Sequence, residues 1–94
     1  MTDLIETKKL LLQRINNKKA IILTKNLALR FEESRILLET DFKELGLTNE
    51  KQRNAHITKV LQKEKADYEW AKYDLSVLEN ELEVLNDLIN KGDD

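Results

Sequence analysis

Helix-breaking residues are almost missing from the interior of this 94-residue chain. It contains no proline and only two glycines, Gly46 and Gly92, whereas Leu, Lys, Glu, Ala and Arg are abundant. These abundant residue types favour the α-helix, and proline and glycine disfavour it. The sequence therefore predicts an all-α fold with one strong interior interruption, at Gly46.

Gly46 is set in a pattern typical of a helix stop followed by a helix start. A glycine in the left-handed conformation commonly ends a helix, and Phe42 and Leu47 are the apolar pair that accompanies such a Schellman stop. Asn49 and Gln52 then have the spacing of a capping box. We expect one helical-hairpin domain over residues 1–94, with helices over about 3–45 and about 49–91 and a turn at 46–48.

The two predicted helices carry different apolar patterns. In the second, apolar residues alternate in steps of three and four and form a heptad seam, which Glu64 interrupts: Ile57, Leu61, Tyr68, Ala71, Leu75, Leu78, Leu82, Leu85 and Ile89. In the first, the main series is closer to an eleven-residue repeat: Ala20, Leu23, Leu27, Phe31, Ser34, Leu38, Phe42 and Leu45. A break at Asn16-Asn17, which would give three helices, stays open as an alternative.

Charge is arranged in blocks along the chain. Residues 1–30 carry seven basic and two acidic side chains, and residues 31–50 carry two basic and six acidic ones. Residues 51–65 are basic again, and residues 66–94 are acidic. Folding the chain back at Gly46 places each basic block beside an acidic one, so the blocks favour an antiparallel hairpin over other alignments.

Both helices also carry apolar residues away from these seams. A helix that is apolar on two faces is expected to be buried on two faces, and a single hairpin can cover only one. We expect a homodimer that completes a four-helix bundle, with Trp70 as its anchor. The alternative is an irregular three-helix fold that covers both faces internally. The candidate protein-interface residues are Ile22, Leu29, Ile36, Val60, Trp70, Tyr73, Val77 and Val84.

Residue types that carry chemistry are scarce. The chain has no cysteine, its one histidine is His56, and it has no glycine-rich phosphate loop. We therefore expect no catalytic, cofactor-binding or metal-binding residue and no enzymatic activity. No apolar run approaches the roughly 18 residues of a membrane span, and Leu4-Ile5 is followed at once by charged residues. We expect a cytoplasmic protein.

Two basic segments leave a nucleic-acid role open. Lysine and arginine neutralise phosphates, but no aromatic residue is interleaved to stack on bases. Each segment also has an acidic block of the same chain as its expected partner. The residues that could contact nucleic acid are Lys8, Lys9, Arg14, Lys18, Lys19 and Lys25.

Residues 47–55 read Leu-Thr-Asn-Glu-Lys-Gln-Arg-Asn-Ala and are followed by Tyr68 and a tail that alternates Leu and Glu. This stretch resembles small helical proteins of bacteriophages and prophages of Gram-positive bacteria, over about residues 47–90. The resemblance implies a phage accessory that acts on host machinery or on a replication or recombination complex. We expect a non-enzymatic, oligomerising protein that binds another protein, as an adaptor or inhibitor; the alternative is a nucleic-acid-associated accessory of phage recombination or replication.

Overall fold

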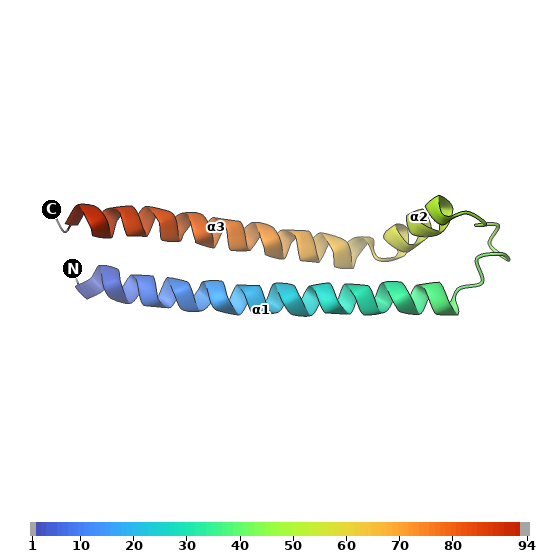
Figure 1. Ribbon diagram of the computed structural model, residues 1–94, viewed down its shortest axis with the longest axis horizontal. Coiled ribbons are helices and arrows are strands. Elements are labelled where there is room, and N and C mark those ends of the chain that lie inside the picture. Colours follow the sequence, from blue (N-terminus) through green and yellow to red (C-terminus); the bar gives the residue numbers. More distant parts are fainter. Residues whose placement is uncertain (1, 93–94) are drawn as a thin grey trace.

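The computed structural model describes residues 2–92 as a long helical hairpin (Figure 1). The helices are α1 (Thr2–Glu39), α2 (Glu50–Val60) and α3 (Gln62–Gly92). Helix α3 runs back along α1, so both ends of the chain lie at one end of a rod that measures 69 × 18 × 15 Å. The predicted all-α hairpin is confirmed, and residues 2–92 include no strand.

Helix α1 is continuous through its most polar stretch. Asn16 and Asn17 are exposed, and the buried Ile15 just before them packs against α3. Packing on the apolar face stabilises the helix more than two weak helix formers destabilise it, so the alternative break is not found. The helix ends at Glu39, six residues before the predicted Leu45. The side chain of Asp41 accepts the backbone N–H of Glu44 at 3.1 Å and starts a separate turn.

Gly46 closes that separate turn as a Schellman motif. The N–H of Leu47 donates to the carbonyl of Phe42 at 2.8 Å, and the N–H of Gly46 donates to that of Lys43 at 3.1 Å. Gly46 has a φ of +75°, the left-handed conformation that this motif requires. The predicted stop is therefore correct in its residues and geometry, but it ends a single turn after α1 and not α1 itself.

Helix α2 begins at the predicted Asn49 cap, in a variant of the capping box in which Gln52 reaches back to Thr48. The side chain of Asn49 accepts the backbone N–H of Gln52 at 2.8 Å, and Asn49 itself has extended backbone angles. In return, the Gln52 side chain accepts the N–H of Thr48 at 3.1 Å. Two backbone donors at the helix start are thereby satisfied, which fixes the first residue of α2.

The predicted single helix over 49–91 is wrong at one residue, Leu61. This residue has φ −99° and ψ 19°, outside the helical region, and separates α2 from α3. Around it the inward positions are Ile57, Leu61, Lys65 and Tyr68, in steps of four, four and three, because Lys65 and not Glu64 is half-buried. Such an insertion into the heptad repeat changes the local winding of a helix, and the backbone at Leu61 accommodates it.

The core is one layer of side chains between the two arms, in two clusters. The first joins Leu11 and Ile15 to Leu78 and Leu85, near the chain ends. The second, near the turn, joins Leu29 and Ile36 of α1 to Ile57 and Leu61. The heptad seam predicted for the second half of the chain is confirmed, since its members are all buried or half-buried: Ile57, Leu61, Tyr68, Ala71, Leu75, Leu78, Leu82, Leu85 and Ile89.

The seam predicted for α1 is wrong. Its predicted members Leu23, Leu27, Phe31 and Leu38 are exposed. The face that packs on α3 has the heptad phase of Leu11, Ile15, Leu29 and Ile36, and this phase also includes Lys8, Lys18, Lys25 and Glu32. Lysine can lay its aliphatic stem along an apolar surface while its ammonium reaches water. These lysines can therefore occupy seam positions, but they interrupt the apolar periodicity by which the seam would be recognised in the sequence.

Cross-helix ion pairs confirm the alignment that the charge blocks predict. Lys18 lies 3.7 Å from Asp74, which joins the basic start of α1 to acidic α3. Lys65 lies 3.6 Å from Glu33, which joins the basic start of the second arm to the acidic end of α1. Each pair is partly exposed and contributes little to stability. They match the antiparallel alignment, which the charge blocks favour over other alignments.

Two neighbouring leucines of α1 test which face is the core. Leu29 is 8% exposed and Leu27 is 58% exposed. We expect Leu29→Ala to lower the free energy of unfolding by about 2–3 kcal/mol, because it removes buried methyl groups and leaves a cavity. The matched Leu27→Ala should change it by less than about 0.5 kcal/mol. Urea denaturation followed by circular dichroism measures both, and the reverse order would contradict the observed face.

Gly46 tests the turn. A Cβ at this position would meet nothing within 4 Å, so a substitution acts through backbone strain alone. We expect Gly46→Ala to destabilise the hairpin by about 1–2 kcal/mol, the cost of a left-handed alanine. Gly46→Asn should cost less, because asparagine tolerates this conformation. Equal losses for the two variants in thermal unfolding would contradict a requirement for the left-handed conformation.

Candidate functional site

Exposed apolar side chains outnumber the buried ones in this hairpin. Among the described residues, nine apolar side chains are buried, whereas sixteen large ones are exposed. None of the described side chains is less than 2% exposed, because a single layer between two helices is open on both sides. Nine of the sixteen exposed residues form two surfaces on different sides of the rod, and these surfaces are the candidate functional sites.

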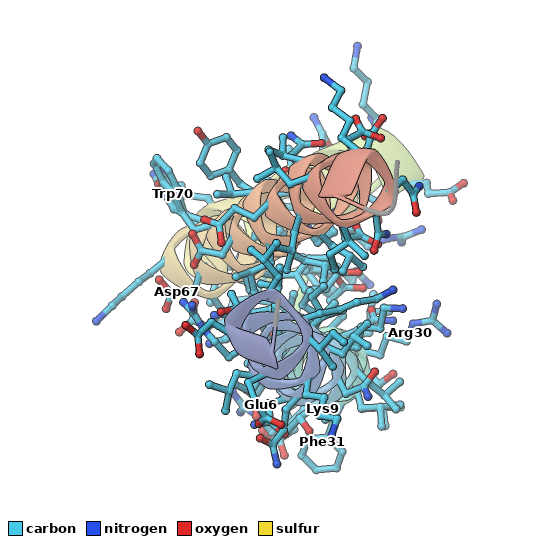
Figure 2. All side chains as sticks on the ribbon, turned by 90° about the vertical axis from the view of Figure 1, so that its left-hand side faces the viewer. Glu6, Lys9, Arg30, Phe31, Asp67 and Trp70 are labelled. Carbon is cyan, nitrogen blue, oxygen red and sulfur yellow. The ribbon has the colours of Figure 1, made fainter. Side chains whose placement is uncertain are left out.

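The first surface follows the flank of α3, and we call it the α3 surface. Trp70, Val77 and Val84 are seven residues apart and all exposed, with Trp70 at 65%. Tyr73 lies edge-on to Trp70, with 5.7 Å between the ring centroids. In the end-on view Trp70 projects from the side of α3, well away from α1 (Figure 2). The α3 surface comprises Trp70, Tyr73, Val77, Val84 and Leu88.

An open groove continues the α3 surface onto α1. Its volume is about 480 Å³. Val77, Val84 and Leu88 form one wall, and Thr7 and Leu11 of α1 form the other. The apolar strip is therefore wider than one helix near the chain ends.

Acidic side chains border the α3 surface. Asp74, Glu81, Glu83 and Asp87 are all exposed on the same helix. Glu69 lies beside Trp70 in the sequence and accepts a hydrogen bond from Lys72 at 3.0 Å, which raises the pKa of the Lys72 ammonium. A molecule that covers this surface must accommodate several carboxylates.

The second surface is the α1 outer stripe, formed by Leu23, Leu27, Phe31 and Leu38. Leu38 is 87% exposed, the largest value among the exposed apolar residues. Phe31 points away from α3 in the end-on view (Figure 2). Nearby charges are already paired within the helix: Arg35 donates to Glu32 and to Glu39, and these hydrogen bonds raise the pKa of the Arg35 guanidinium. The stripe is apolar and has few free charges around it.

The predicted interface residues divide between the surface and the core. The structure places Val60, Trp70, Tyr73, Val77 and Val84 on the surface. Leu29 and Ile36 are buried in the second core cluster, and Ile22 is half-buried on the same face of α1. Leu29 and Ile36 are therefore core positions, because the second arm covers the face on which they lie, and Ile22 is half-buried on that face. The exposed apolar residues of α1 are instead those of the α1 outer stripe, whose regular spacing had predicted a core seam.

The six basic residues of the first segment do not share one face. Lys8, Lys18 and Lys25 are half-buried along the seam with α3. Lys9, Arg14 and Lys19 are exposed, but residues five apart are rotated by about 140° from one another around a helix. Phosphate binding needs several cations aimed at one backbone. The structure does not bring this set together.

Catalytic chemistry has few candidates among the described residues. His56 is half-buried and lies edge-on to Phe42, with ring centroids 6.0 Å apart. Between Thr2 and Gly92, no group of three or more His, Cys, Asp or Glu side chains is arranged to hold a metal ion. Within the same residues, no helix has the length and apolar character needed to cross a membrane.

The scattered basic residues of α1 predict that the protein binds DNA weakly. We expect no gel shift of single- or double-stranded DNA at about 50 mM salt, because no face of α1 presents enough cations to release counterions. A shift that is lost on exchanging Lys18 and Lys19 for Glu would contradict this expectation. The control exchanges Lys51 and Lys59 for Glu, which changes the net charge equally in the other basic segment.

Comparison with known proteins identifies no relative: no protein-family model, no curated protein and no solved structure matches the chain. The resemblance of residues 47–90 to phage helical proteins therefore stays a prediction. The two apolar surfaces and the charges around them are the basis for a functional proposal.

Proposed function

We propose that this chain is a non-enzymatic, self-associating helical hairpin that binds another protein, as an adaptor or inhibitor. The observation that carries the proposal is the excess of exposed over buried apolar side chains among the described residues. Exposed apolar surfaces of this extent usually mark interaction sites. The absence of cysteine and the single histidine also favour a binding role over a catalytic one.

Stability supports self-association. Small chains bury a modest fraction of their surface and are marginally stable alone, and this one has no disulfide to compensate. Fully burying a side chain such as Val or Leu contributes about 1.5–3 kcal/mol. The five residues of the α3 surface are 37–65% exposed, so covering them contributes about half of that value per residue and offsets part of the entropy lost on association.

The two surfaces allow two separate roles. The α3 surface carries Trp70 and Tyr73, aromatic residues of the kind enriched at interface hot spots, and we assign self-association to it. The α1 outer stripe lies on another side of the rod and is free to bind a different protein while the assembly persists (Figure 2). The resemblance to phage helical proteins would make that protein a component of host machinery or of a phage replication complex.

The mass in solution tests the proposal. We expect light scattering on a size-exclusion column to give a mass of two or more chains of 11.0 kDa each. Trp70→Glu should return the protein to a monomer, because it removes the aromatic anchor and places in the interface a carboxylate that is costly to bury. Ser76→Glu adds the same charge at an exposed position of α3 outside the surface and should leave the mass unchanged. A wild-type monomer at high micromolar concentration would overturn self-association.

A further inference from the structure

The charges beside the α3 surface restrict what can cover it. Asp74 and Glu81 flank Val77 on the exposed side of α3. If two α3 surfaces packed on each other, these carboxylates would face the same carboxylates of the second copy. Like charges brought together across an interface oppose association. Self-pairing of α3 is therefore disfavoured, and a basic helix is the favoured occupant.

The basic N-terminal half of α1 has the matching charge. Lys18 already lies 3.7 Å from Asp74 within one chain. The segments of α1 and α3 at this height along the rod therefore have complementary charges. A pocket lined by Arg14 and Lys18 of α1 and by Tyr73, Asp74 and Val77 of α3 places them on one side of the hairpin.

This part of α1 also supplies apolar contact area. Leu10, four residues before Arg14, and Ile21, seven residues after it, are exposed. Leu10 and Arg14 together line a second pocket with Glu81 of α3. The same side of the hairpin therefore presents an acidic apolar strip from α3 and a basic, partly apolar strip from α1, side by side.

Resting on the proposed self-association, we infer that a second copy of this chain covers the α3 surface with the N-terminal half of its α1. The two hairpins are related by a two-fold axis parallel to the rod. Under this symmetry the α3 strip of each copy faces the α1 strip of the other, and like ends of the two rods lie together. Every helix then has antiparallel neighbours, as in four-helix bundles.

The size of the flank is sufficient for a stable dimer. The proposed contact runs along about half of a face of 69 × 18 Å, which is about 600 Å² per partner, and stable interfaces bury about 600–1,000 Å² per partner. The register between the two copies follows from the hairpin itself. A two-fold axis parallel to the rod leaves the position of each residue along the rod unchanged. Val77 of one copy therefore lies against the Arg14–Lys18 segment of the second copy.

Cross-linking between single-cysteine chains tests this arrangement, and the natural chain has no cysteine to interfere. Asn17→Cys and Val77→Cys are made separately in full-length chains, and one carries an affinity tag so that mixed products are identified by size. The two chains are mixed in denaturant, refolded together and treated with a short bismaleimide. Neighbouring helices of a bundle are about 10 Å apart, whereas diagonal ones are about 14 Å apart.

We expect the mixed 17–77 product to exceed the 77–77 product several-fold. Ser76→Cys, at an exposed position outside the α3 surface, replaces Val77→Cys in the control and should give little product with Asn17→Cys. A predominant 77–77 product, or no 17–77 product from protein that light scattering finds assembled, overturns the inferred arrangement. A monomer by light scattering overturns the proposed self-association itself, so the two failures are distinguishable.

Discussion

The apolar seam between α1 and α3 is the interaction on which the rest of this protein depends. Leu11, Ile15, Leu78 and Leu85 form one half of it, and the cluster around Leu29 and Ile36 forms the other half. Because the seam is a single layer, each helix has one covered face and leaves the rest of its circumference to solvent. The exposed apolar surfaces follow directly from this geometry, since a two-helix rod has no third element to cover them.

Charge complements the seam by fixing direction and register. The half-buried Lys18 of α1 lies along the seam and has its ammonium group 3.7 Å from Asp74 of acidic α3. The same acidic character of α3 then discourages two α3 surfaces from meeting. One charge distribution therefore aligns the hairpin and, in our proposal, selects how a second copy packs against it.

The second half of the chain was predictable because its local and long-range signals agree. Its seam residues are nearly all apolar, so the heptad phase is visible in the sequence, and the Gly46 stop and the Asn49 cap depend on nearby backbone groups. Helix α1 was not predictable in the same way. Two apolar series compete along it, and the one with fewer polar interruptions, from Leu23 to Leu38, is the exposed one. The predicted interface was therefore correct on α3 but not on α1: Trp70 and Val84 are on the surface, whereas Leu29 and Ile36 are buried.

The sequence by itself determined the helical character of the chain, the left-handed turn at Gly46 and the antiparallel direction. Helix propensity and capping act between residues close in the sequence, and the order of the charge blocks along the chain favours one direction of folding back. Only the tertiary structure decided which face of α1 is buried and that the second arm breaks at Leu61. Both depend on matching the phase of one helix to that of its neighbour. A core position is chosen by the partner that covers it, and the most apolar face of an isolated helix need not be that position.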